Sequence, residues 1–131
     1  RLARQRDELG IVMDQIGSPT YAQDLAIAVK DILGSFDEDS INKIYHYGGS
    51  VSCSWADFAE DIVSEAVAIG LINKNLSIER ITSEEFPTLA KRPKNSCLNS
   101  RRIESVFGIT TSNYQKGISK ALAALEKLNV N

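Results

Sequence analysis

The sequence predicts an α/β or α+β fold with about four helices and three short strands. Two observations carry this prediction. Apolar runs of strand length alternate along the chain with segments of helical periodicity, and glycines or polar turns separate the two kinds. The 131 residues fit one small domain, residues 1–131, and the 43% hydrophobic and 24% charged composition is ordinary for a globular protein.

The first elements are a strand and a helix joined by a polar loop. Residues 9–13 form an apolar run that suits a strand buried on both faces, as in a parallel sheet. The loop 14–20 follows, and Thr20 with Gln23 predicts a capping box for a helix that ends at Gly34. The apolar residues of this helix recur at helical spacing and predict one buried face, made of Leu25, Ala28, Val29, Ile32 and Leu33.

The middle of the chain repeats this order. Residues 44–47 predict a second strand, in which we expect His46 to be packed rather than to act as a ligand. Ser54 with Asp57 begins a second helix, which Gly70 closes with a left-handed cap. The inner face of that helix is predicted to consist of Trp55, Phe58, Ala59, Ile62, Ala66 and Ile69.

The last third adds a strand, a long loop and two helices. Residues 76–81 alternate as a half-exposed strand would, and the segment 82–96, with two of the three prolines, is the best candidate for a functional loop. Asn99 is the expected N-cap of a helix through Phe107, with Gly108 as its stop. The final helix presents an apolar face made of Ile118, Leu122, Leu125 and Leu128.

Charge and composition exclude several classes of function. The 15 basic and 17 acidic residues give a formal net charge of -2, whereas a nucleic-acid binder shows a basic surplus. Cys53, Cys97 and the single histidine are too few to build a structural zinc site, so we predict no metal. The two cysteines could form a disulfide, but we expect two buried thiols. No apolar stretch is long enough to span a bilayer, and we expect a cytoplasmic protein.

Two polar segments are candidates for binding, and no catalytic set is predicted. The sequence contains no Gly-rich dinucleotide motif, no P-loop, no nucleophile elbow and no Tyr-x-x-x-Lys pair. Residues 14–20 follow a predicted strand, at the edge where open α/β sheets bind ligands, or they form only a strand-to-helix turn. Residues 91–96 carry Arg92, whose planar donor fork suits a phosphate, or they form a solvated basic turn.

Three segments in register resemble the signatures of the dTDP-4-dehydrorhamnose reductase family. Residues 14–20 are similar to its D-Q-x-G-x-P-T motif, and residues 44–59 are similar to its strand, glycine and S-W-x-x-F-A stretch. Residues 86–98 closely match its Y-P-T-P-A-x-R-P-x-x-S-x-L loop, with phenylalanine in place of the tyrosine. The order and separations agree, and the resemblance covers essentially the whole chain.

This resemblance implies the C-terminal substrate-binding part of a Rossmann-type extended short-chain dehydrogenase. Such enzymes reduce dTDP-4-dehydro-6-deoxy-L-mannose to dTDP-L-rhamnose with NADPH or NADH, for bacterial surface polysaccharides. The NAD(P)-binding half with the catalytic Tyr-x-x-x-Lys would precede Arg1, where the chain reads like the tail of a helix and lacks an initiating methionine. We therefore expect this chain alone to be inactive, to bind no cofactor and to need the N-terminal half as its partner.

The resemblance also implies which residues bind the dTDP-sugar nucleotide. Arg92 is expected at the pyrophosphate and Gln15 at the substrate, and the other residues expected at or near the cleft are Pro19, Thr20, Asn95 and Ser96. An alternative is a non-catalytic regulatory subunit like the β subunit of methionine adenosyltransferase, which shares the R-P-x-x-x-x-L loop. The surface that the N-terminal half would cover predicts an exposed apolar patch and self-association into homo-oligomers.

Overall fold

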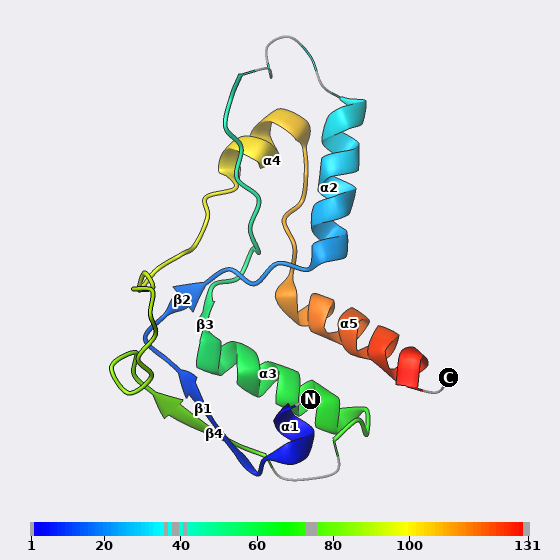
Figure 1. Cartoon of the computed structure of the whole chain (residues 1–131). Coiled ribbons are helices and arrows are strands. Elements are labelled where there is room, and N and C mark those ends of the chain that lie inside the picture. The colour runs from blue at the N-terminus through cyan, green and yellow to red at the C-terminus, as the bar shows by residue number, and fades with distance from the viewer. Residues whose placement is uncertain (1, 36, 38–39, 41, 73–75, 130–131) are drawn as a thin grey trace.

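The computed structural model describes residues 2–35, 37, 40, 42–72 and 76–129, and it confirms the α/β prediction (Figure 1). The elements are α1 (Leu2–Gln5), β1 (Glu8–Val12), β2 (Ile16–Gly17), α2 (Ala22–Gly34), β3 (Cys53–Ser54), α3 (Trp55–Ala68), β4 (Ser77–Ile81), α4 (Arg101–Phe107) and α5 (Tyr114–Asn129). The strands predicted at 9–13 and 76–81 and the predicted helices are therefore present.

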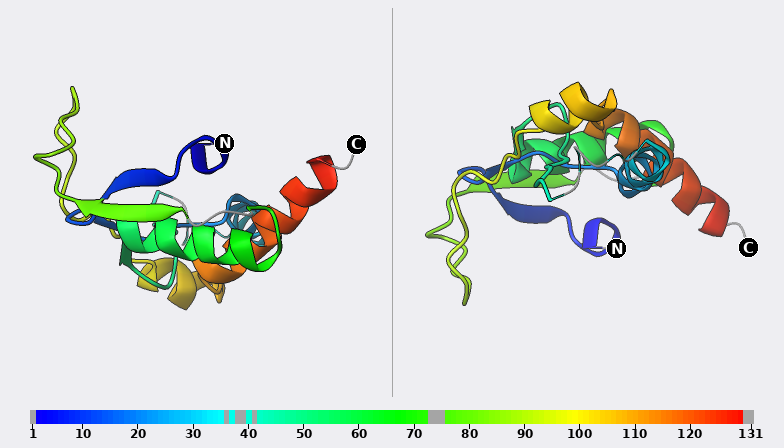
Figure 2. Two further views of the ribbon diagram at one scale, coloured as in Figure 1. Left: turned by 90° about the horizontal axis from the view of Figure 1, so that it is seen from below. Right: turned by 90° about the horizontal axis from the view of Figure 1, so that it is seen from above.

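Two small sheets organise the chain. β1 and β4 run parallel, with Glu8 opposite Ser77 and Val12 opposite Ile81. α3 packs against this pair, and the loop 82–96 projects away from the end of β4 (Figure 2). β1 is only partly buried, rather than buried on both faces as predicted, because β4 is its one strand neighbour among the described residues.

The core lies between α3 and α5. Ile118 and Leu122 of α5 are buried together with Tyr114, and Phe58 of α3 packs against them. The rings of Phe58 and Tyr114 meet edge to face, with centroids 5.5 Å apart. Burying a side chain such as Ile118 or Leu122 contributes about 1.5–3 kcal/mol, so this helix pair carries much of the stability.

The predicted capping box of α3 is confirmed. Ser54 Oγ accepts a hydrogen bond from the Asp57 backbone N–H at 3.0 Å, and Asp57 Oδ2 accepts one from the Ser54 backbone N–H at 2.9 Å. Gly70 has positive φ, as expected for a left-handed end of α3, and Gly108, the expected stop of α4, has positive φ as well. The capping residues and the glycines near these helix ends therefore predicted the ends correctly.

This capping box should make stability sensitive to acid. Hydrogen bonds from Ser54, and further ones from Arg80, lower the pKa of Asp57 from 3.8 to about 2. A depressed pKa stabilises the fold fully above the unfolded value and loses that contribution as the pH falls through about 2. We expect Asp57→Asn to flatten the fall in unfolding free energy between about pH 4 and pH 2, measured by denaturant titration. An unchanged slope in both this variant and Ser54→Ala would contradict the prediction.

The strand predicted at residues 44–47 is wrong. The segment has no ladder partner among the described residues, and a strand exists only where a neighbouring backbone pairs with it. Tyr45 instead packs against Phe107, with ring centroids 5.0 Å apart, beside the second buried cluster of Ala28, Ile103 and Ile109. His46, expected to be packed, is exposed.

The predicted start and buried face of α2 also differ from the structure. α2 follows Tyr21 without a side-chain cap, because Thr20 Oγ1 donates to the Ser18 carbonyl instead. Within α2 only Ala28 is fully buried, Ile32 is half-buried, and the rest of the predicted face is exposed: Leu25, Val29 and Leu33. Helical spacing identified the apolar side of α2, but it could not identify what covers that side.

Smaller differences concern the other helices. α4 begins at Arg101 after Ser100, although Asn99 Oδ1 does accept the Arg101 backbone N–H at 3.0 Å. Trp55 and Ile69, expected on the inner face of α3, are exposed. The expected apolar positions of α5 are buried at Ile118 and Leu122 and exposed at Leu125, and the Leu128 side chain lies outside the described residues.

Candidate functional site

An open pocket lies where β1 and β4 end and α3 begins. Its volume is about 620 Å³, within the roughly 300–1,000 Å³ of small-molecule sites. Ligands of open α/β sheets bind at the carboxyl ends of parallel strands, and this pocket occupies that position. It is lined by Gly10, Ile11, Val12, Gln15, Trp55, Phe86, Thr88, Arg92, Pro93 and Ser96.

A hydrogen-bonded relay orients Gln15 in this pocket. Gln15 Nε2 donates to Ser83 Oγ at 2.8 Å, and Ser83 Oγ donates to Asp14 Oδ1 at 2.7 Å. The Ser83 hydroxyl lowers the pKa of Asp14, so its carboxylate is ionised and can only accept. Ser83 must then donate to Asp14 and accept from Gln15, which turns the Gln15 Nε2 group toward Ser83 and leaves Oε1 able to accept a hydrogen bond from a ligand.

The end of the loop 82–96 is fastened to β2, close to Arg92. The Ile16 backbone N–H donates to the Lys94 carbonyl at 2.8 Å, and the Ser96 backbone N–H donates to the Ile16 carbonyl at 2.9 Å. Asn95 forms a parallel bridge with Ile16, and its Oδ1 accepts the Cys97 backbone N–H. Within the part of the chain that the structure describes, the Arg92 guanidinium has no hydrogen-bond or ion-pair partner, so its donors are open to a ligand.

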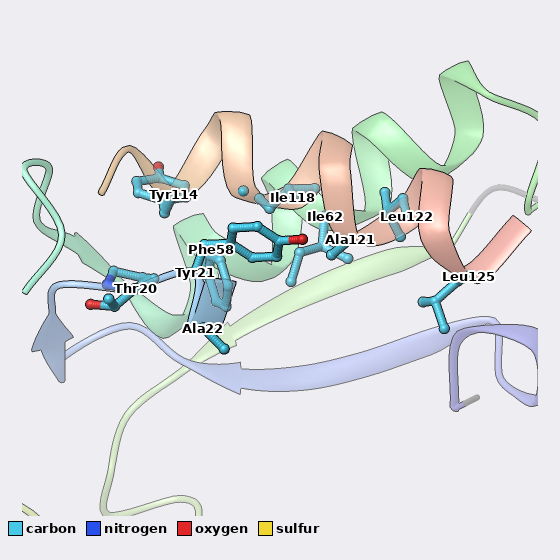
Figure 3. A pocket seen from close by; sticks show the side chains of 12 residues that line it. Thr20, Tyr21, Ala22, Phe58, Ile62, Tyr114, Ile118, Ala121, Leu122 and Leu125 are labelled. Carbon is cyan, nitrogen blue, oxygen red and sulfur yellow. The ribbon is translucent and has the colours of Figure 1, made fainter. Parts of the chain in front are cut away.

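Pro19 and Thr20 lie at a different pocket. That pocket has a volume of about 310 Å³ and is mainly apolar, because Tyr21 and Ala22 face side chains of α3 and α5 across it (Figure 3). Thr20 Oγ1 accepts the Gly49 backbone N–H at 3.0 Å. The apolar wall consists of Phe58, Ile62, Tyr114, Ile118, Ala121, Leu122 and Leu125.

The predicted binding residues therefore fall into separate groups. Gln15, Arg92 and Ser96 meet in the pocket at the strand ends. Pro19 and Thr20 line the pocket of Figure 3, although Pro19 also borders a small hollow with Ser96. Asn95 lines none of these pockets and instead bridges the loop to β2.

Two aromatic residues of the site were not predicted. Trp55 fits the spacing of an inner helix face, but it is the first residue of α3 and its side chain is 48% exposed. Phe86 lies in the loop 82–96 and is 57% exposed. A large aromatic side chain in a polar, proline-containing loop was the available indication, because apolar residues in such loops have no core to join.

The described residues hold no group of three or more His, Cys, Asp or Glu side chains placed to bind a metal ion. Across the same part of the chain, no helix has the length and apolar character needed to cross a membrane.

Cys53 and Cys97 are both free thiols, and burial raises the pKa of Cys53.

Comparison with known proteins gives consistent matches. Residues 1–127 match the family model described as "RmlD substrate binding domain". The chain is 44% identical over 131 residues to dTDP-4-dehydrorhamnose reductase of Aggregatibacter actinomycetemcomitans, a match that covers 96% of this chain and 44% of that protein. The chain thus spans less than half the length of the curated relatives it matches.

Solved structures show the same likeness. A dTDP-4-dehydrorhamnose reductase from Clostridium acetobutylicum superposes with a TM-score of 0.82 and 30% identity, over 95% of this chain and 41% of that one. The Bacillus anthracis enzyme, solved in complex with NADP, superposes with a TM-score of 0.77 and 31% identity, over 92% and 39% of the two chains.

Proposed function

The chain belongs to the RmlD substrate binding domain family, and on this premise we propose that it forms the sugar-nucleotide side of a dTDP-4-dehydrorhamnose reductase. The whole enzyme would reduce dTDP-4-dehydro-6-deoxy-L-mannose to dTDP-L-rhamnose with NADPH or NADH, in the cytoplasm, for surface polysaccharide synthesis. The convergence of Gln15, Arg92 and Ser96 in one pocket at the strand ends is the observation that carries this proposal.

Each polar residue of the pocket has a role in the proposal. Arg92 donates to the diphosphate, for which its planar guanidinium provides two parallel N–H groups. Gln15 Oε1 accepts a hydrogen bond from a ligand N–H or O–H group, because the relay through Ser83 occupies its Nε2 side. Asn95 and Ser96 are positioning residues that fasten the Arg92 loop to β2.

In this proposal, the role of Pro19 and Thr20 is to form the turn between β2 and α2. The Thr20 hydroxyl joins this turn to Gly49, and the turn leads from the pocket at the strand ends to the apolar pocket of Figure 3. Their contribution to substrate binding would then be indirect, through the position of β2 and of the Gln15 that precedes it.

Nicotinamide cofactor binding is assigned to the rest of the enzyme. A dinucleotide pyrophosphate needs a Gly-rich turn between a strand and a helix, and the segment between β1 and α2 offers only Gly17 in its 14–20 loop. The residues of this chain do not fit such a cofactor. The sequence also has no Tyr-x-x-x-Lys pair to supply a proton during hydride transfer, so the chain alone is expected to be inactive.

The deciding experiment is a matched reductase assay. Oxidation of NADPH or NADH is followed with dTDP-4-dehydro-6-deoxy-L-mannose, on this chain and on the product of its full-length gene. We expect turnover only by the full-length protein. Failure of both to turn over, together with tight capture of a methionine adenosyltransferase, would replace the reductase with the regulatory-subunit alternative.

The exposed side of α2 predicts self-association of the isolated chain. Leu25, Val29 and Leu33 recur every four residues on α2 and are 42%, 49% and 74% exposed. In the proposed enzyme, the nucleotide-binding part covers this stripe, and without it two copies can bury the stripe against each other. Sedimentation velocity should show a mass that rises with concentration, and Val29→Lys should return the chain to a monomer.

The control for that measurement is Asp31→Lys, which places the same side chain on another side of α2 and should leave the association intact. A monomer over the whole concentration range for the unmodified chain would contradict the prediction.

A further inference from the structure

The pairing of β1 with β4 continues beyond the last backbone pair through a side chain. The Met13 backbone N–H donates to the Ile81 carbonyl at 2.9 Å, and two residues after Ile81 the Ser83 backbone N–H donates to Asp14 Oδ1 at 2.9 Å. The Asp14 carboxylate thus takes the place of a backbone carbonyl. This contact fixes the position of Ser83 relative to the end of β1.

The Ser83 hydroxyl has a single proton, and that proton is used in a hydrogen bond to Asp14. Ser83 Oγ donates to Asp14 Oδ1 at 2.7 Å, and the same oxygen accepts the Ser83 backbone N–H. The preceding residue is held as well, because Glu85 Oε2 accepts the Thr82 backbone N–H at 2.7 Å and the Thr82 hydroxyl at 2.8 Å. Ser83 Oγ is therefore an acceptor toward Gln15, whose Nε2 donates to it at 2.8 Å.

The residues of this relay differ in their access to a ligand. Gln15 and Arg92 line the pocket at the strand ends, whereas Asp14 and Ser83 do not. Because Gln15 Nε2 is engaged by Ser83, the atom that Gln15 offers to a ligand is the acceptor Oε1. Carbonyl and phosphate oxygens are acceptors too, so at Oε1 they would lack a hydrogen-bond partner. Arg92, by contrast, offers donors only.

We propose that Asp14 and Ser83 are positioning residues that determine specificity: they fix the Gln15 amide so that its side of the pocket accepts a ligand O–H or N–H group and excludes carbonyl and phosphate oxygens. This inference rests on the proposed function and adds to it a rule for the orientation of the ligand. The diphosphate fits at Arg92 alone, and a part of the ligand that carries hydroxyl or N–H groups lies at Gln15.

The test replaces Ser83 and compares ligands that differ in their donor groups. Ser83→Ala frees Gln15 Nε2, so the amide can turn either end toward the pocket. By calorimetry, this variant should bind dTDP-L-rhamnose about threefold to tenfold more weakly than the unmodified chain does. Inorganic pyrophosphate, which offers Gln15 acceptor oxygens, should bind no more weakly. Equal weakening of dTDP would place the donor on the nucleoside, and unchanged dTDP would place it on the sugar.

Nuclear magnetic resonance of the Gln15 side-chain amide tests the orientation without a ligand. In the unmodified chain, the Nε2 proton bonded to Ser83 should exchange slowly with solvent. Ser83→Ala should speed this exchange, and Ser83→Thr, which keeps a hydroxyl, should restore it to the slow rate. Asp14→Asn keeps a carbonyl oxygen that can accept from Ser83 and should retain slow exchange, whereas Asp14→Ala should lose it.

The matched control is Ser105→Ala, which removes an exposed serine hydroxyl of α4 that donates to the Arg102 carbonyl and does not line the pocket. It should change neither the three affinities nor the Gln15 amide. Equal weakening of all three ligands in Ser83→Ala, or no change in any of them, would overturn the specificity role while the proposed function stands. Absence of dTDP binding by the unmodified chain would overturn both.

Discussion

Arg92→Ala is expected to weaken binding of dTDP to the chain by roughly tenfold to a hundredfold, the usual effect of losing a charge-assisted bidentate contact. The guanidinium lines the pocket and has no other described partner, so its removal leaves the diphosphate without its cation and leaves no protein group unpaired. Calorimetric titration with dTDP measures the change directly. Because the loss is electrostatic, it should be greatest at low ionic strength.

Two further variants separate the arginine fork from general positive charge. Lys91→Ala removes the neighbouring exposed cation, which does not line the pocket, and should change the affinity by less than about twofold. Arg92→Lys keeps the charge but loses the planar pair of donors, so its affinity should fall between those of the unmodified chain and Arg92→Ala. Equal affinity of Arg92→Ala and the unmodified chain would exclude Arg92 from the site.

Gly49→Ala is expected to lower the free energy of unfolding by about 1–3 kcal/mol, the usual range for an added methyl group in a filled space. A β-carbon at position 49 would lie 2.2 Å from the Pro19 carbonyl oxygen. That oxygen belongs to the backbone, so no side chain can turn aside, and the turn between β2 and α2 would have to shift. The Thr20 hydrogen bond to the Gly49 N–H would shift with it. Urea unfolding monitored by circular dichroism gives the change.

Gly34→Ala is the matched control for this substitution. A β-carbon at Gly34, the last residue of α2, would meet no atom within 4 Å, and its φ is not positive. The variant should therefore be as stable as the unmodified chain, or more stable by about 0.5–1 kcal/mol, since alanine favours helix. Similar destabilisation by both substitutions would show that the close approach of Gly49 to Pro19 does not constrain the fold.

The elements that could be predicted from the sequence are those whose causes are close in the chain. Ser54 and Asp57 are three residues apart, and their capping box begins α3 as expected. Gly70 and Gly108 end helices by the backbone freedom of a single residue. The apolar run at the position of β1 also predicted a strand of a parallel sheet, because such strands are apolar along most of their length.

What could not be predicted depends on which surfaces come into contact, because a local sequence pattern does not encode this. The segment 44–47 has strand composition, but pairing needs a neighbour that the described chain does not provide. Leu25 and Val29 have helical spacing, but the spacing does not say whether this chain covers them. In both cases the local pattern is correct, but it does not say which surface the segment contacts.

The same division applies to the candidate site. Gln15 and Arg92 were predicted because motifs resembling a known family contain them, and the structure brings both into one pocket. The role of Ser83 in orienting Gln15 was not predicted, because nothing in the sequence relates two residues separated by 68 positions. Trp55 was misplaced because a residue at the first position of a helix shares the spacing of the inner face without sharing its burial.

The relay between Asp14, Ser83 and Gln15 has a consequence for the order of folding. Asp14 and Ser83 are 69 positions apart, so their contact closes a long loop. The chain must lose the conformational entropy of that loop before the contact can stabilise the fold. α3 lies inside that loop and forms from neighbours in sequence, so it can be present before the strands on either side of it meet. The pocket is complete only once β1 and β4 have paired, so a nucleotide that binds it stabilises the native state. Such a nucleotide should slow unfolding of the chain.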